Sequence, residues 1–571
     1  MDVSDVKNCI GISKTTFNSS ACVISNQGDK IDLEVVLTER LSRKKNSGAW
    51  PEKALQNIKN RYDFDKSIFA DNRDVLSGNE LEIRLNNQFP FYEHIRSLGL
   101  ESCININNNN LTNLTHHMCH AEAVNMISPF RKSLILVIDG AGSNSKDFLE
   151  THSEFSFIPK KNSDDDFFEE YSVYSLIDGD LRCLKKKWQI IYKKENGNYS
   201  FGTSVGLFYE EISKYIFNDK LAAGKVMGLA AYGKPQKISD RIEYLETLDW
   251  SYSFKGKGKA QWESSNNIDL YANMAASVQQ HFEEELLNLI KNLKLEYPEY
   301  NNLILTGGCA LNCTNNMKLL NKNVFDNIFI PPFPGDESIS LGAASYLWYR
   351  VLNNKWTPVP WNNQISFFGS KASVPTELEI KDFFANFNYK KPHSITEFVA
   401  EELLKGKIIA WFQGRSEIGP RALGHRSILA FPDQNGLKSK LNNEVKFRES
   451  FRPYGCIVLS ELVSKYFEVP EGFQTPFMTF AVEVKPKYRE RLKEVSHFDF
   501  TSRIQTINPQ QDELIYKIIQ KVGEVSSLFC ILNTSLNLMG EPIVETIEDA
   551  RNFLLKSNVD GLAIGDYFIY K

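Results

Sequence analysis

Two histidines, four residues apart, stand shortly before an apolar run that ends in a carboxylate. The first stretch is THHMCHA at 115–121, and the second is LILVIDGAG at 134–142. A helix over residues 115–127 would place His116 and His120 on one face, one turn apart. A buried strand at 134–138 would then deliver Asp139 into a glycine turn, so the pattern favours an α/β arrangement with a metal site at a strand end. On spacing alone, packed histidines with ordinary hydrogen-bond partners explain the pattern equally well.

A second carboxylate in a turn offers a fourth ligand. Asp336 follows the proline-rich stretch IFIPPFPGD at 328–336 and precedes a helix expected from about residue 338. One interpretation is that Asp336 caps that helix. The other is that it completes a metal set with His116, His120 and Asp139.

Length and charge narrow the class of protein. A chain of 571 residues exceeds a single core, so we expect two or three domains. Lys plus Arg number 66 against 71 Asp plus Glu, and the net charge of -5 disfavours nucleic acid as the main partner. No apolar run reaches the roughly 18 residues of a membrane span, and the N-terminus lacks a signal-like core. We expect a cytoplasmic protein whose nine scattered cysteines are reduced.

The N-terminal part is typical of an α/β nucleotide-binding fold. Short strands are expected at 8–13, 20–25 and 32–37, and a long amphipathic helix at 270–293. Another buried strand, at 302–306, runs into paired glycines, where backbone amides can approach a nucleotide. Lys225 could reach a phosphate, and the spacing of Asn312 and Asn316 predicts that both line one helix face. We expect irregular strands and loops over the site between residues 150 and 198.

A proline-containing stretch at 353–360 marks the expected boundary, after which basic residues gather among tight turns. Arginine forks match phosphate oxygens, so this density in a net-acidic chain indicates a pocket for a small phosphorylated or carboxylated compound. A solvated charged face is the alternative, although the interspersed glycines and prolines argue against it. The candidate residues are Arg415, Arg421, Lys446, Arg448 and Arg452, with Arg503, Asn533 and Ser535 as further anion contacts.

Taken together, these motifs resemble the O-carbamoyltransferases of the nodulation-protein and antibiotic-tailoring type, over nearly the whole chain. The resemblance rests on HHMCHA, VIDGAG, GKVMGLAAYG, LTGGCALNCTNN, GDESISLGAA, GRSEIGPRALGHRSIL, VKFRESFRP, TSRIQTI and ILNTSLNLMGEPIV, in the family's order. It implies an α/β protein with an N-terminal Kae1-like domain of the actin/Hsp70/sugar-kinase ATPase fold at 1–355. A linker at 356–370 and a C-terminal α/β YrdC-like domain at 371–571 would follow.

The resemblance also implies an activity and its site residues. The YrdC-like domain would use carbamoyl phosphate and ATP, with Mg²⁺, to make carbamoyl adenylate, and the Kae1-like domain would transfer the carbamoyl group to a hydroxyl. Metal ligands would be His116, His120, Asp139 and Asp336, holding Fe²⁺, with Mn²⁺ or Zn²⁺ as alternatives; with Lys446 they form the expected catalytic set. Nucleotide contacts would be Gly140, Gly142, Lys225, Gly228, Gly307, Gly308, Asn312 and Asn316. The carbamoyl phosphate pocket would be the basic cluster above together with Asn533 and Ser535.

Two departures from the family pattern remove charges near these sites. Phe17-Asn18 stands where the family commonly has histidine-aspartate, and Phe431-Pro432-Asp433 where it usually has aspartate-proline-arginine. For the base that activates the acceptor hydroxyl, Asp336, Glu337 and His117 are the candidates.

We expect the acceptor to be a hydroxylated small molecule, a sugar or a natural product, bound by the Phe17-Asn18 turn and the segment 144–198. Phe167, Phe168, Tyr171 and Tyr174 could stack on it, although loop packing explains them more simply. Whether the chain forms a homodimer is left open. Two rival functions remain. One is a threonylcarbamoyl-type tRNA modification enzyme, which the net negative charge of the chain disfavours, and the other is a nucleotide-binding regulatory protein without catalytic activity. A metalloprotease is excluded because no HExxH motif is present.

Overall fold

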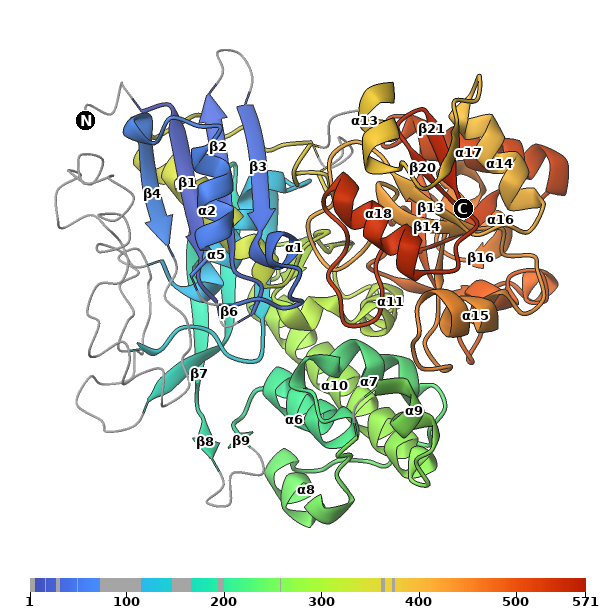
Figure 1. Cartoon of the computed structure of the whole chain (residues 1–571). Coiled ribbons are helices and arrows are strands. Elements are labelled where there is room, and N and C mark those ends of the chain that lie inside the picture. The colour runs from blue at the N-terminus through green and yellow to red at the C-terminus, as the bar shows by residue number, and fades with distance from the viewer. Residues whose placement is uncertain are drawn as a thin grey trace.

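Two mixed sheets form the N-terminal part of the computed structural model, drawn in blue, cyan and green in Figure 1. The structure describes residues 6–15, 17–26, 31–48, 50–71, 114–145, 166–193, 200–256, 258–360, 365–371 and 375–571. The first sheet has the order β3-β2-β1-β4, in which β1 pairs antiparallel with β2 and parallel with β4. Its strands are β1 (Asn8–Ser13), β2 (Ser20–Asn26), β3 (Ile31–Leu37) and β4 (Ser67–Asp71). The short helices α1 (Thr38–Ser42) and α2 (Glu52–Lys59) lie between β3 and β4 in the chain.

The second sheet carries the central strand that the sequence predicts. Its order is β11-β10-β5-β6-β7, with β5 parallel to β10 and antiparallel to β6. Strand β5 is buried from Ser133 to Ile138, which explains its apolar run. The strands are β5 (Lys132–Ile138), β6 (Phe167–Ile177), β7 (Asp180–Ile190), β10 (Asn302–Thr306) and β11 (Asn327–Phe329), and β8 (Tyr192–Lys193) pairs with β9 (Ser200–Phe201) separately.

Helices α5 (His116–Ile127) and α12 (Ile339–Tyr346) lie between these sheets. Helix α12 packs on β1 and β2, whereas α5 packs on β5 and β6. The two helices approach so closely that a Cβ atom on Gly342 would lie 1.8 Å from the carbonyl oxygen of Cys119. This tight contact brings the start of α12, and with it Asp336, beside the histidines of α5.

A group of helices lies below the sheets in Figure 1 and completes the N-terminal part. The long helix α10 (Ile268–Glu296) packs against α6 and α7, and its length agrees with the amphipathic helix expected there. The other members are α6 (Val205–Phe217), α7 (Ala223–Ala230), α8 (Arg241–Thr247), α9 (Gly258–Glu263) and α11 (Cys313–Asn321). None of the helices among the described residues has the length and apolarity needed to cross a bilayer.

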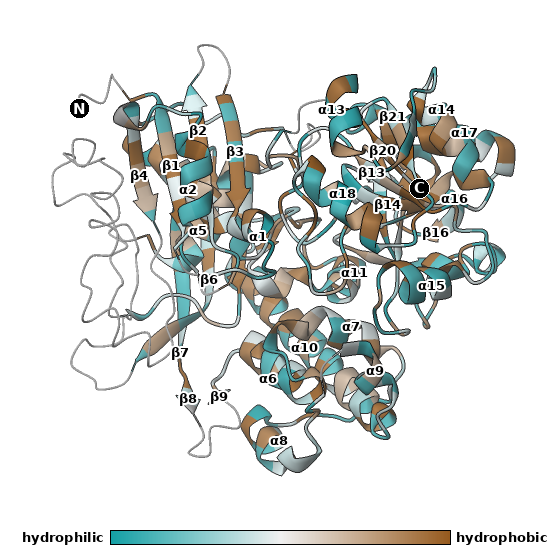
Figure 2. Cartoon of the chain, viewed as in Figure 1, coloured by the Kyte–Doolittle hydropathy of each residue, from teal (hydrophilic) through white to brown (hydrophobic). Residues whose placement is uncertain are grey.

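The C-terminal part, orange and red in Figure 1, is built on one ten-stranded sheet with the order β12-β21-β20-β13-β14-β19-β15-β18-β17-β16. Hydrophobic residues gather on its central strands, such as β13, β14 and β20 (Figure 2). The strands are β12 (Asn388–Lys390), β13 (Ile409–Phe412), β14 (Arg426–Ala430), β15 (Gly455–Leu459), β16 (Phe467–Glu468), β17 (Ala481–Val484), β18 (Thr501–Ile507), β19 (Cys530–Ser535), β20 (Gly561–Ile564) and β21 (Tyr567–Tyr570). The helices are α13 (Glu377–Phe383), α14 (Ile395–Leu404), α15 (Leu437–Lys440), α16 (Val463–Tyr466), α17 (Glu513–Ser526) and α18 (Ile547–Lys556). The mixed α/β class expected from sequence is therefore confirmed.

The structure refines one expectation about the N-terminal part. Residues 167–190, expected as irregular strands and loops, form an antiparallel hairpin of two eleven-residue strands, β6 and β7. Its pairing is irregular near Glu169 and between Val173 and Tyr174, which interrupts the alternation of side chains in the sequence. The rest of the segment expected to bind an acceptor, residues 146–165 and 194–198, lies outside the described residues.

Candidate metal centre and anion pocket

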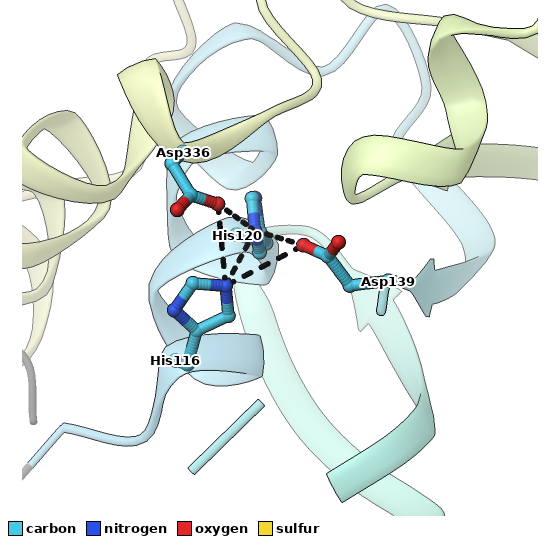
Figure 3. Close-up of side chains that lie close together, drawn as sticks. All are labelled: His116, His120, Asp139 and Asp336. Carbon is cyan, nitrogen blue, oxygen red and sulfur yellow. Dashed lines mark hydrogen bonds and ion pairs between the residues drawn. The ribbon is translucent and has the colours of Figure 1, made fainter. Parts of the chain in front are cut away.

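Four side chains from three separate segments point their donor atoms at one spot (Figure 3). Asp139 Oδ2 lies 3.5 Å from Nε2 of both His116 and His120. Asp336 Oδ1 lies 3.4 Å from Nε2 of His116 and 3.9 Å from that of His120, and the two imidazole nitrogens are 3.3 Å apart. Four ligands at about 2.1 Å from a tetrahedral metal ion would lie about 3.4 Å from one another, so the spacing fits a metal site.

A hydrogen bond behind His120 sets the ring nitrogen that faces the cluster. Ser338 Oγ donates to the carbonyl oxygen of Gly335 at 2.8 Å, which uses its single hydrogen. It must therefore accept from His120 Nδ1–H, which lies 3.1 Å away. The Nε2 atom is left without a proton and can serve as a ligand, as is usual for metal-binding histidines.

The two carboxylates of the cluster favour a positive charge among its four side chains. Burial opposes a charge on His116, yet the Asp336 and Asp139 carboxylates outweigh burial and raise the pKa of this imidazole well above its usual value. Asp139 Oδ2 and His116 Nδ1 are buried, and neither has a hydrogen-bond partner among the described residues. A proton or a metal ion among these atoms would compensate the two carboxylates, and the four side chains together could hold a metal.

Asp336 does not cap the helix that follows it, which was the alternative explanation of this residue. It is the first residue of a 3₁₀ turn, Asp336–Ser338, and no side-chain cap bond forms at the start of that turn or of α12. Its carboxylate points instead at the histidines (Figure 3).

A cavity of about 2330 Å³ joins this metal centre to the basic residues of the C-terminal part. His116, Asp139 and Asp336 lie on its wall, whereas His120 is fully buried behind them. The cavity exceeds the roughly 300–1,000 Å³ of a usual ligand pocket, so it has room for more than one substrate. Five of the candidate nucleotide contacts also line it, namely Gly140, Lys225, Gly228, Gly308 and Asn312.

Cations crowd the opposite wall and form what we call the anion pocket. Its members are Arg421, Lys446, Arg448, Arg452 and Arg503, with Asn533 and Ser535 beside them. Burial and then the charge of Arg503 lower the pKa of Arg421 to about 9, and burial with Arg448 lowers that of Arg452 to about 10. Arg421 has no hydrogen-bond or ion-pair partner within the described part of the chain. The repulsion among these positive side chains favours binding of an anion.

Lys446 and Lys225 lie at the cavity but already have partners. Lys446 Nζ donates to the carbonyl oxygens of Ser535 and Asn537 and to Asn537 Oδ1, each at 2.6 Å. Lys225 Nζ pairs with Glu449 at 2.9 Å, which links helix α7 to the C-terminal part. Lys446 therefore holds the segment that carries Ser535, and Lys225 contacts the anion pocket from the N-terminal side.

Four expected contacts do not reach the cavity. A Cβ atom on Gly142 would lie 2.5 Å from Glu169 Oε2, and Gly307 has a φ of +91° and a Cβ position 2.2 Å from the carbonyl oxygen of Ile138. These glycines are required by packing and by backbone conformation. Asn316 is fully buried and donates to the carbonyl oxygens of Ala310 and Thr479. Arg415 donates to those of Leu33, Phe368 and Gly369.

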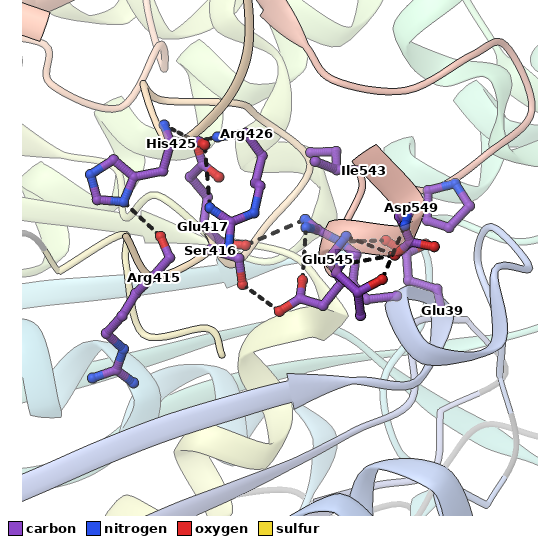
Figure 4. Close-up of polar contacts among 12 residues, drawn as sticks. Glu39, Arg415, Ser416, Glu417, His425, Arg426, Ile543, Glu545 and Asp549 are labelled. Carbon is purple, nitrogen blue, oxygen red and sulfur yellow. Dashed lines mark hydrogen bonds and ion pairs between the residues drawn. The ribbon is translucent and has the colours of Figure 1, made fainter. Parts of the chain in front are cut away.

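Arg415 belongs instead to a buried polar contact between the two parts of the chain (Figure 4). Arg40 of α1 donates to the carbonyl oxygens of Glu417 and Gly419 and lies 3.6 Å from Glu545. Glu417 in turn accepts from the backbone amides of Leu423, His425 and Arg426. These bonds hold the loop that carries Arg421 against the N-terminal part.

The structure also corrects the search for a base. His117 is fully buried, its Nδ1 lies 2.8 Å from Ser172 Oγ, and burial lowers its pKa to about 3, so it does not face the cavity. Glu337 lies on the wall, where burial raises its pKa to about 7. Glu210 of α6, which the sequence did not single out, also lines the cavity, and burial together with Asp139 raises its pKa to about 8.

Sequence reasoning missed Glu210 and Lys45 because neither belongs to a motif. Lys45 follows α1 and lines the cavity near Lys446. Of the four aromatic residues considered for stacking, Phe168 lines the cavity, whereas Tyr174 is buried in the core. Phe17 and Asn18 line it as well, but Asp433 pairs with Arg491 at 2.6 Å, away from it.

Comparisons with known proteins agree with one another. A family model described as the carbamoyltransferase N-terminus matches residues 71–345, and one described as the carbamoyltransferase C-terminus matches residues 400–571. Nodulation protein NolO of Bradyrhizobium diazoefficiens is 31% identical over 474 residues, covering 80% of this chain and 79% of that protein. Nodulation protein NolNO of Sinorhizobium fredii is 29% identical and covers 99% of this chain and 81% of its own. The 3'-hydroxymethylcephem-O-carbamoyltransferase of Streptomyces clavuligerus is 25% identical, covering 70% and 73%.

Proposed function

Since the chain belongs to the carbamoyltransferase family, we propose that it is an ATP-dependent O-carbamoyltransferase. In this proposal it makes carbamoyl adenylate from carbamoyl phosphate and ATP and transfers the carbamoyl group to a hydroxyl of a small molecule. The N-terminal part would be the Kae1-like domain and the C-terminal part the YrdC-like domain, divided as the sequence predicts. One observation carries the proposal: the metal centre and the anion pocket lie on one cavity.

The opposite charges of the two walls support a division of labour. Carbamoyl phosphate and ATP are both anions, and the cations of the anion pocket suit them. Phosphate leaves carbamoyl phosphate on hydrolysis, and the resulting carbamate displaces pyrophosphate from ATP to give carbamoyl adenylate. We assign this activation to Arg421, Arg448, Arg452 and Arg503, with Mg²⁺ accompanying ATP. Lys446 holds Ser535 and Asn537 in place.

In the second step the carbamoyl group would pass to the acceptor beside His116, Asp139 and Asp336. The acceptor oxygen bonds to the carbamoyl carbon, the bond to the AMP oxygen breaks, and the hydroxyl proton must be removed. A divalent ion held by His116, His120, Asp139 and Asp336, which we propose to be Fe²⁺, would supply Lewis acidity for the developing charge. Two imidazoles with two carboxylates suit iron, and also Mn²⁺ or Zn²⁺.

We assign the removal of the proton to Glu210. This carboxyl lines the cavity, has no hydrogen-bond or ion-pair partner among the described residues, and lies beside the loop after Asp139. A Cβ atom on Gly140 would be 3.0 Å from Glu210 Oε1, so this carboxyl lies directly against the loop. The acceptor we propose is a hydroxylated sugar or natural product.

The test is a reconstitution with the full chain, ATP, Mg²⁺, carbamoyl phosphate, Fe²⁺ and a panel of alcohols, analysed by mass spectrometry. We expect carbamoyl adenylate without any acceptor, and a carbamate ester once the right alcohol is present. Adenylate formation also distinguishes this proposal from a regulatory protein without chemistry. If no adenylate forms with any of the metals, the proposed function is wrong, and carbamoylation of tRNA instead would support the tRNA-modifying alternative.

A further inference from the structure

A single buried carboxylate joins two of the three segments that carry the metal ligands, helix α5 and the loop after β5. Glu169 Oε2, on β6, accepts from the backbone amide of His117 at 3.3 Å and from that of Ser143 at 2.9 Å. His117 lies in the first turn of α5, and Ser143 lies in the loop that begins at Asp139. The side chain of Glu169 is fully buried.

Further bonds tie these segments together around the carboxylate. Ser143 Oγ accepts from the backbone amide of His116 at 2.8 Å, so the loop also contacts the helix directly. The backbones of Gly142 and Ser143 exchange hydrogen bonds with that of Glu169, at 2.8 and 3.0 Å. Gly142 leaves room for the carboxylate, because a Cβ atom there would lie 2.5 Å from Glu169 Oε2 and 2.7 Å from the His117 ring. Packing against Glu169 therefore explains this glycine.

A buried lysine balances the charge. Lys186 of β7 donates to Glu169 Oε1, and it also contacts Ser172 Oγ at 3.2 Å and the Tyr174 hydroxyl at 3.0 Å. Its side chain is 1% exposed. Burial alone would raise the pKa of Glu169, but Lys186 lowers it to about 2, so the carboxylate is ionised and the pair is a full ion pair. Removing one partner of such a pair leaves an uncompensated buried charge.

We propose that the Glu169–Lys186 ion pair is a positioning device for the metal centre, which sets the distance between the histidines of α5 and Asp139. It touches neither substrate nor metal. It acts through backbone amides on both ligand-bearing segments, and it comes from the β6–β7 hairpin on the edge of the sheet. The inference rests on the proposed metal centre, but not on the chemistry proposed for the acceptor.

The neighbouring residues of the same hairpin provide a matched control. Glu170 and Lys187 form an ion pair at 2.9 Å, one position along each strand, with the Lys187 side chain 48% exposed. Glu170 accepts from the Thr203 hydroxyl and, among the described residues, makes no hydrogen bond to α5 or to the loop after Asp139. Both pairs thus join a glutamate of β6 to a lysine of β7. Among the described residues, only the Glu169–Lys186 pair is bonded to α5 and to the loop after Asp139.

The experiment measures Co²⁺ binding to the metal-free full chain, by titration calorimetry and by the visible absorption of bound Co²⁺. The variants are Glu169→Gln, Lys186→Met, the double variant and Lys187→Met. We expect Glu169→Gln and Lys186→Met each to weaken Co²⁺ binding about 10- to 100-fold and to change the Co²⁺ spectrum. The double variant should lose less than the product of the two single losses, because the residues act as one unit. Lys187→Met should bind like wild type.

Carbamoyl adenylate formation and thermal unfolding separate positioning from general damage. If the ion pair positions the metal ligands, the single variants that fold should keep adenylate formation while losing metal affinity. Glu169→Gln is isosteric, so it carries the test if Lys186→Met does not fold. Equal metal affinity in Glu169→Gln and Lys187→Met would overturn the inference alone. Equal metal affinity in wild type and His120→Ala would overturn the metal centre and this inference together.

Discussion

The two walls of the cavity carry groups of opposite charge, but each wall brings several like charges close together. On the N-terminal wall, two carboxylates and two imidazoles meet, and Asp139 Oδ2 is buried with no hydrogen bond in the described part of the chain. On the C-terminal wall, cations depress each other's pKa, and Arg421 lacks a partner within the described residues. The two carboxylates of the first wall repel each other, as do the arginines of the second, so each wall favours a counterion. The difference supports the ligands that we propose for the two walls: a cation on the first and phosphorylated compounds on the second.

The strongest way to break this comparison is to remove a metal ligand. His120→Ala should reduce metal affinity by more than about 100-fold, because it deletes a ligand rather than a supporting group. Carbamoyl transfer should be lost with it, whereas adenylate formation should persist, since the anion pocket lies on the other wall. Elemental analysis and mass spectrometry check the two outcomes. Metal content equal to wild type would contradict the assignment of His120.

The reciprocal change is made on the C-terminal wall. Arg421→Ala or Arg452→Ala should lower adenylate formation about 10²- to 10³-fold, the usual effect of removing a donor that stabilises a transition-state anion. Metal content should stay at the wild-type level. Arg489→Ala is the control, because Arg489 pairs with Glu483 and does not line the cavity. A loss of metal in the Arg421 or Arg452 variant would contradict the division between the walls.

A finer test concerns the serine behind His120. Ser338→Ala should weaken metal binding about tenfold, because it removes the acceptor that keeps the proton on Nδ1 and leaves Nε2 free. Ser345→Ala in the following helix α12 is the control, since Ser345 Oγ is buried and has no hydrogen-bond partner among the described residues. Calorimetric titration with Co²⁺ measures the effect. Identical affinities of the two variants would show that Ser338 does not set the tautomer.

The last effect concerns pH and the metal-free protein. The pKa of Glu210 rises from 4.5 to about 8, through burial and then Asp139, so the folded state keeps a proton that the unfolded state releases in this range. The free energy of unfolding should therefore fall as pH rises from 4.5 towards 8. Glu210→Gln should lose less stability over the same interval, as measured by chemical denaturation. Parallel curves for wild type and variant would contradict the environment assigned to Glu210.

Much of the local structure could be predicted from the sequence. The strands at 8–13, 20–25 and 32–37, the helix that carries His116 and His120, and the strand before Asp139 all lie where their apolar patterns place them. Such patterns depend on side-chain periods of 2 and 3.6 residues, which neighbouring residues reveal by themselves. The β6–β7 hairpin was expected only as irregular strands and loops, because irregular pairing breaks its period.

Selection among candidates of the same type required the tertiary structure. Arg415 and Arg421 belong to one motif, yet Arg415 binds backbone carbonyls at the contact with the N-terminal part, and Arg421 faces the cavity. Gly140 and Gly142 are similarly close in sequence, but Gly142 makes room for Glu169. The direction of each side chain depends on packing partners that the motif does not contain.

The sequence by itself determined the α/β class, the helical spacing of His116 and His120, the carboxylate after a buried strand, and the basic composition of the C-terminal part. Only the tertiary structure decided that Asp336 faces the histidines, that Glu210 lines the same cavity, and that the two walls oppose each other. The physical reason is the range of the interactions. Local periodicity is set by backbone geometry along a few residues, whereas the packing of α5 against α12 depends on burial between segments far apart in the chain.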